Sequence, residues 1–203
     1  MGSRSRFLTA AALAFALAAC GSQSESENAP AGGEATGEVA AAPDAGATGA
    51  GATGAAPADA PTAAPQFVAM AASGGMYEVE SSQLAKQQAK NADVKAFADM
   101  MIRDHTKANE ELKAAAGKAS PPPTVPTALN PEHQSMLDQL KSAGANFDKT
   151  YLDQQRTAHE KTLALLNGYA SGGDSQPLKD WASKTKPAVQ QHLDKVQQLA
   201  GKM

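Results

Sequence analysis

Apolar and small residues recur every three or four positions from Phe67 to the end of this 203-residue chain. This spacing places them along one face of an α-helix. Turn-forming residues interrupt the pattern and divide it into four long helices, predicted over about 67–90, 93–117, 146–170 and 175–199, and one short helix over 131–143. No stretch alternates like a strand for long, so we expect an all-α fold.

A proline-rich segment separates the predicted helices into two pairs. Within each pair only a tight turn joins the two long helices, so they must be antiparallel. Between the pairs, residues 118–130 contain four prolines and reach about 40 Å in polyproline conformation, enough to run the length of a 25-residue helix. Two antiparallel pairs and one long crossover predict a ferritin-like four-helix bundle with an extra short helix. Asp93 and Asn146 are the expected N-caps, and Pro187 is expected to bend the last helix.

The first twenty residues have the sequence of an export signal. Residues 1–6 are basic, and residues 7–19 form an uncharged, mostly apolar run too short to cross the ~30 Å core of a membrane as a helix. The run ends in Leu-Ala-Ala-Cys20-Gly21, which resembles the bacterial lipobox, where the signal is cleaved before an acylated cysteine. We therefore expect residues 1–19 to be a lipoprotein signal peptide and Cys20 to be the lipid anchor. Gly21 resembles the pattern of lipoproteins sorted to the outer membrane, so we expect the protein at its periplasmic face.

The segment from Cys20 to residue 65 is predicted to be a disordered linker. Of residues 21–65, 36 are Ala, Gly, Pro, Ser or Thr, and none is aromatic. Such a segment buries too little apolar surface to offset the entropy cost of ordering it. The folded domain is therefore predicted to be residues 66–203, whose 16 basic and 15 acidic residues exclude nucleic-acid binding by bulk charge. A single cysteine also excludes an internal disulfide and an iron–sulfur cluster.

One ligand-type side chain lies in or beside the apolar stripe of each long helix: Glu78, His105, His159 and His192. Two interpretations are open. In one, these side chains bind a single transition-metal ion, with zinc, copper, iron and manganese as candidates, and Asp104 supports the ligands from behind. In the other, each is a core polar residue that bonds to a neighbour, as buried polar groups must. The neighbours available are Tyr77, Tyr151, Tyr169, Asp104 and backbone carbonyls.

Counting residues from the predicted turns tests whether the four side chains share one level. Glu78 and His105 come out level across the first pair. His159 and His192 differ by five residues, or about 7 Å along the helix axis, which argues against a single four-ligand layer.

Other chemistry finds less support in the sequence. A di-iron centre normally uses two Glu-x-x-His motifs, and this chain has neither. Met70, Met76, Met100 and Met101 are the residue type of a copper(I) thioether site, but methionine on an apolar helix face is expected to be core packing. His133 is expected to be a solvated surface residue. We therefore predict a non-enzymatic protein; the alternative is a metal-dependent redox enzyme acting on peroxide or metal ions.

The helical region also resembles a known family. The matching residues are Phe67-Val68, Gly74-Gly75-Met76-x-Glu78-Val79, Gln83-Leu84-Ala85, Asp104-His105, Phe147-Asp148-x-x-Tyr151, His159 and His192-Leu193. They are similar to the domain of unknown function 4142 family of exported bacterial proteins, often labelled outer-membrane proteins. The resemblance implies a ferritin-like bundle in the cell envelope, with Glu78, Asp104, His105, His159 and His192 as its signature polar positions. It implies no established reaction; metal handling or a role in envelope stress is the expected function.

Overall fold

The computed structural model describes residues 60–203, which contain five α-helices and one 3₁₀ turn, Gly144–Asn146, and no strand. The helices are α1 (Ala64–Gln88), α2 (Ala92–Ala116), α3 (Pro131–Lys141), α4 (Phe147–Gly172) and α5 (Gln176–Ala200). The predicted all-α class is thereby confirmed. The predicted signal peptide, Cys20 and most of the predicted linker lie outside the described residues. None of the helices in residues 60–203 has both the length and the apolar character that a membrane crossing requires.

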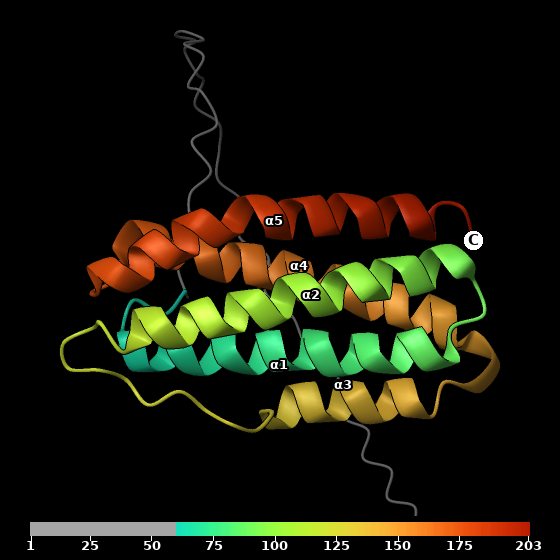
Figure 1. Cartoon of the computed structure of the whole chain (residues 1–203), viewed down its shortest axis with the longest axis horizontal. Coiled ribbons are helices and arrows are strands. Elements are labelled where there is room, and N and C mark those ends of the chain that lie inside the picture. Colours follow the sequence, from blue (N-terminus) through green and yellow to red (C-terminus); the bar gives the residue numbers. More distant parts are fainter. Residues whose placement is uncertain (1–59) are drawn as a thin grey trace, which may run out of the picture. The chain divides into compact units, whose positions relative to one another are not determined.

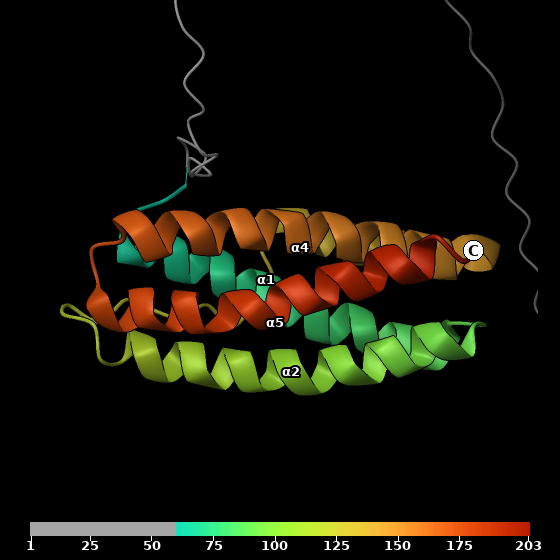
Figure 2. The ribbon, with the colours of Figure 1, turned by 90° about the horizontal axis from the view of Figure 1, so that it is seen from above.

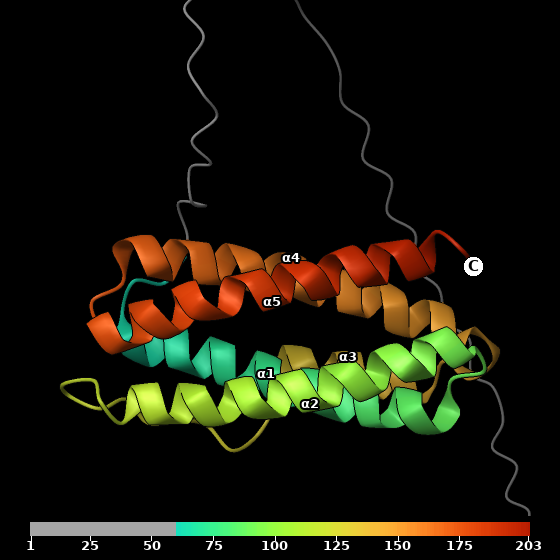
Figure 3. The same ribbon diagram turned by 45° about the horizontal axis from the view of Figure 1, so that its top comes forward.

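Two antiparallel helix pairs, α1 with α2 and α4 with α5, form a four-helix bundle (Figure 1). Further contacts of α2 with α5 and of α1 with α4 close the ring (Figures 2 and 3). Asp148, in the first turn of α4, accepts hydrogen bonds from the backbone N–H groups of Lys90 and Asn91 in the α1–α2 turn. The helices α2 and α4 therefore start at the same end of the bundle, which is the predicted ferritin-like topology.

The crossover is shared between the proline-rich segment and α3. The segment is long enough to follow a whole helix, but it ends at Asn130, whose N–H donates to Ser73 Oγ at 2.9 Å. Ser73 lies about a third of the way along α1. The side chain of Asn130 then caps α3 by accepting a hydrogen bond from His133 N, and α3 packs against α1 and α4.

The helix ends differ from the predicted ones by a few residues. The first helix begins at Ala64, three residues before Phe67, because Pro65 is tolerated in a first helical turn. Asn91, and not the predicted Asp93, caps α2: its Oδ1 accepts from Asp93 N at 2.8 Å. Asp93 lies inside the first turn, where it cannot cap. Asn146 precedes α4 as predicted, but its side chain makes no capping hydrogen bond.

A polar layer at mid-length lies between the two larger clusters of the apolar core. One cluster surrounds Phe67 and Tyr169, whose stacked rings lie 3.8 Å apart between centroids. The other surrounds Phe97 and Tyr151 at the opposite end. The buried polar side chains between them are Ser73, Glu78, Ser81, Ser82, His105, Gln155, His159 and His192. This layer is the candidate site.

Candidate metal centre

Three imidazoles from three helices meet in the polar layer. His105 of α2, His159 of α4 and His192 of α5 have ring centroids 5.3–5.6 Å apart. Each ring is at most 7% exposed. Each offers a ring nitrogen that lies within 4.8 Å of those of the other two. The bundle therefore brings three of the four predicted ligands together.

Each of these rings has one buried nitrogen without a hydrogen-bond partner among the described residues: Nε2 of His105, Nε2 of His159 and Nδ1 of His192. A buried polar atom left unpaired costs about 1–3 kcal/mol, so three at one place call for a ligand. At the largest separation of 4.8 Å, an ion at the centre would lie about 2.8 Å from each nitrogen, against ~2.0–2.1 Å for a Zn–N bond. A shift of under about 1 Å per ring closes the triangle on an ion.

The remaining nitrogens of two rings are held by partners that fix their orientation. Nδ1 of His159 lies 2.7 Å from the backbone oxygen of Gln155 and donates its proton to it. Nε2 of His192 lies 2.9 Å from Oδ2 of Asp104 and donates to the carboxylate. In both rings the other nitrogen then carries the lone pair, which is the arrangement that metal-binding histidines use.

Burial keeps two of the three imidazoles neutral. It lowers the pKa of His159 to about 4, with His192 nearby adding to the effect. Burial also holds the pKa of His105 well below its usual value, and both neighbouring imidazoles lower it further. At neutral pH these two rings are therefore in the unprotonated form that binds metals.

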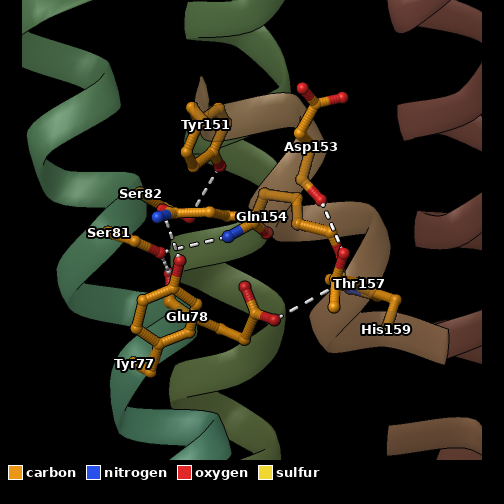
Figure 4. A network of polar contacts seen from close by, with 10 residues as sticks. Tyr77, Glu78, Ser81, Ser82, Tyr151, Asp153, Gln154, Thr157 and His159 are labelled. Atoms are coloured by element: carbon orange, nitrogen blue, oxygen red, sulfur yellow. Dashed lines mark hydrogen bonds and ion pairs between the residues drawn. The ribbon is translucent and has the colours of Figure 1, made fainter. Parts of the chain in front are cut away.

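Glu78 lies beside the three histidines and not among them. Its Oε1 is 3.5 Å from Nδ1 of His159, the nitrogen that bonds to the Gln155 carbonyl, and Oε2 has no partner among the described residues (Figure 4). Burial raises the pKa of Glu78 to about 8, so its carboxyl group is mostly protonated at neutral pH. Glu78 is therefore placed to act on His159 from behind, on the side away from the free Nε2.

The interpretation as satisfied core residues explains only part of this layer. The three tyrosines bond elsewhere: Tyr77 to Gln154, Tyr151 to Ser82 and Tyr169 to Asp174. Asp104 and a backbone carbonyl do satisfy one nitrogen each of His192 and His159, as that interpretation expects. The free nitrogen on each of the three rings remains without a partner in residues 60–203.

The predicted 7 Å offset between His159 and His192 was wrong. His159 lies thirteen residues before the end of α4 and His192 sixteen after the start of α5. The difference is three residues, not five, because α4 continues to Gly172, two residues beyond its predicted end. The rings themselves meet, with their centroids 5.5 Å apart.

Two residues of the region were missed or misplaced by the sequence analysis. Gln155 is fully buried, orients His159 through its carbonyl and donates from Nε2 to Ser81 Oγ at 3.1 Å. Its position four residues before His159, on the same stripe, was the available signal. His133, expected in solvent, is half-buried instead: its Nδ1 is 2.7 Å from Ser73 Oγ, and its ring stacks on Tyr77.

The four methionines differ in burial, and Met76 and Met100 are partly buried. Met101 is fully buried in the core as expected, but Met70 is 48% exposed, so core packing does not account for it.

A cavity of about 30 Å³ adjoins the site. Its wall includes Gly75, Glu78, His105, Asn109 and Trp181. This volume is large enough for one water molecule next to Glu78 and His105.

Comparison with known proteins gives one family and one fold relative. Residues 49–199 match the family described as Domain of unknown function (DUF4142). No protein of curated function matches the sequence. Among solved structures, the fold is similar to "CopM in the Cu(II)-bound form", with a TM-score of 0.58 and 17% sequence identity over 69% of this chain and 97% of that one. At this identity the similarity concerns the helical fold alone.

Proposed function

Because this chain belongs to the DUF4142 family and gathers three imidazoles at one buried place, we propose that it is a cell-envelope protein that binds one transition-metal ion. His105, His159 and His192 are the proposed ligands. The observation that carries the proposal is the free, buried nitrogen on each of the three rings. In the proposed mature protein, acylated Cys20 anchors this bundle to the membrane through the linker.

Copper is the ion we expect to bind most tightly. Neutral imidazoles suit zinc, copper and iron, and among divalent first-row ions affinity is normally highest for Cu²⁺. The similar structure named above is, by its title, a copper(II) complex, which supports the same choice. Calcium and magnesium prefer oxygen ligands and are not expected here.

The surrounding residues would prepare the ligands before the ion arrives. Asp104 and the Gln155 carbonyl hold His192 and His159 in the tautomers that point a lone pair inward. Such supporting bonds typically contribute 10–100-fold to metal affinity. The protonated Glu78 adds no negative charge at neutral pH, so the ligand set would remain neutral.

The test is copper(II) binding by the purified chain after removal of loosely held metal. We expect one equivalent per wild-type chain and none in His105→Ala or His159→Ala. His133→Ala, which changes the fourth histidine of the chain, is the matched control and should retain the copper. Copper retained by both His105→Ala and His159→Ala would overturn the proposal. If the copper-loaded wild type turns over peroxide and the two histidine variants do not, the redox enzyme is favoured instead.

A further inference from the structure

A second group of metal-ligating side chains lines a pocket on the outside of the bundle. Met70 of α1 and His133 and Met136 of α3 lie in the wall of a pocket of about 70 Å³ between α1, α3 and α4. Met70 is one of only two large apolar side chains that residues 60–203 leave exposed. His133 and Met136 are three residues apart, so they lie on one face of α3.

The ring of His133 can adopt the tautomer that binds a metal through Nε2. Ser73 Oγ lies 2.7 Å from its Nδ1 and also accepts a hydrogen bond from Asn130 N. A hydroxyl oxygen has two lone pairs, so it can accept from Nδ1–H as well and leave the lone pair on Nε2. Burial lowers the pKa of His133, which favours the neutral ring. The two charged residues of the pocket, Glu132 and Lys161, form an ion pair with each other.

The pocket and the internal cavity meet at two shared wall residues, Gly74 of α1 and Thr162 of α4. Met70, Gly74 and Glu78 follow one another at intervals of four residues, so they form a stripe about 12 Å long on one side of α1. Thr162 lies one turn after His159. The stripe therefore leads from the exposed Met70 to the wall of the cavity that His105 also lines.

Gly74 has no side chain at this shared wall, although packing does not require a glycine there. A Cβ atom added there would meet only Cε1 of His133, at an ordinary 3.7 Å. Glycine inside a helix is less stable than alanine, so the absence of a side chain here has a cost that packing does not explain.

From these observations we propose that Met70, His133 and Met136 form a surface site for a soft monovalent metal ion, Cu(I), which then reaches the three histidines past Gly74 and Thr162. Thioether sulfur selects Cu(I), and imidazole binds copper as well, so no change of oxidation state is needed for the transfer. The existence of the surface site does not depend on the proposed function. Delivery of the ion to the three histidines does rest on the proposed function, because it needs a metal site there.

Silver(I), a redox-inert ion that accepts the same soft ligands, is the probe for the surface site. All variants carry Cys20→Ser, so that the single thiol does not compete. We expect two equivalents in the parent chain, and one after either Met70→Leu with Met136→Leu or His105→Ala with His159→Ala. Leucine conserves the volume of methionine, so the fold should be kept. Met203→Leu, at the other exposed methionine, is the matched control.

Methyl resonances of the seven methionines report the site directly. Those of Met70 and Met136, assigned by the leucine variants, should shift on the addition of silver, and that of Met203 should not. If only the histidine variant loses an equivalent and neither methyl resonance moves, the surface site is wrong and the proposed function stands. If only the methionine variant loses one, the proposed function fails and the surface site stands.

The route is tested by the rate at which the ion fills the three-histidine site. Trp181 is the only tryptophan and lines the cavity with His105, so its fluorescence reports arrival of the ion. We expect Gly74→Leu and Thr162→Leu each to slow the quenching about tenfold at an unchanged final amplitude, and Gly74→Ala to stay within about twofold. Unchanged rates in both leucine variants would overturn delivery along this path.

Discussion

Oε1 of Glu78 lies 3.5 Å from Nδ1 of His159, and both side chains are almost completely buried. Burial acts on the two groups in opposite directions: it raises the pKa of the carboxyl group to about 8 and lowers that of the imidazole to about 4. Both groups are therefore mostly uncharged at neutral pH. These two groups thus avoid buried charge in the metal-free protein, which makes its stability depend on pH.

The metal-free protein should be most stable near pH 6.5. Below that pH the unfolded chain binds protons on His105 and His159 that the folded chain does not, so stability is lost as the pH falls toward 4. Above it, the folded chain retains the Glu78 proton that the unfolded chain has released, so stability falls until about pH 8. Between about pH 4.5 and 6.5 the two histidines outweigh the one carboxyl group. Urea unfolding between pH 4.5 and 9 measures the profile, and a steady rise to pH 9 would contradict it.

Replacing Glu78 by glutamine should remove the alkaline side of this profile. The amide does not ionise, so the variant no longer carries the cost of burying a carboxylate above pH 8. Relative to the wild type, we expect the variant to be about 4 kcal/mol better at pH 8.5 than at pH 5. The unpaired amide lowers its stability equally at both pH values and therefore does not change this difference. Urea midpoints at the two pH values are compared, with the exposed Glu80→Gln as control. An equal effect at both would show that Glu78 does not titrate in this range.

The bundle could be predicted from the sequence because its apolar residues recur at helical spacing. A stripe of apolar residues identifies a helix and its buried face whatever the neighbouring helices do, so His105, His159 and His192 were correctly placed inside. Their relative heights depend on where each helix ends, and an error of two residues at the end of α4 enlarged the counted offset from three residues to five. Capping preferences locate a helix end only to within a few residues.

Counting residues along the helices could not predict where the Glu78 carboxylate lies relative to the three histidines. Whether its carboxylate joins the three histidines or lies behind His159 depends on the rotation of α1 about its axis and on side-chain packing. The surface pocket was missed for a related reason: α3 lies outside the four-helix ring, and its place was fixed by the bond of Ser73 to Asn130, which no periodicity encodes.

Asp104 should affect metal affinity far more than stability. Its side chain is 44% exposed, and its bond to Nε2 of His192 orients the ring whose Nδ1 is buried and has no partner among the described residues. Asp104→Asn is expected to weaken copper(II) binding about 10–100-fold and to change the unfolding free energy by less than about 0.5 kcal/mol. Competition with a chelator of known affinity measures the first effect. The exposed Asp194→Asn on α5 is the control; equal affinities in the two variants would show that the Asp104 bond does not support a ligand.

Asp148 should do the opposite, affecting stability without affecting the metal. Its carboxylate accepts from the N–H groups of Lys90 at 3.0 Å and Asn91 at 2.8 Å, and it is 9% exposed. Asp148→Ala leaves two N–H groups of the α1–α2 turn without their acceptor, and bonds to a charged group contribute about 1.5–3 kcal/mol each. We expect a loss of about 2–4 kcal/mol in urea unfolding, because water replaces part of these bonds.

The matched control is Asp153→Ala, on the same helix but half-exposed and paired only with surface cations, which should cost less than about 1 kcal/mol. Copper stoichiometry should remain at one in both variants, because Asp148 lies at the end of the bundle and the three histidines lie at its middle. If Asp148→Ala loses the metal while remaining folded, the closed end of the bundle and the site are coupled. In that case the level of the three rings is set by the α1–α2 turn and not by the packing of the polar layer.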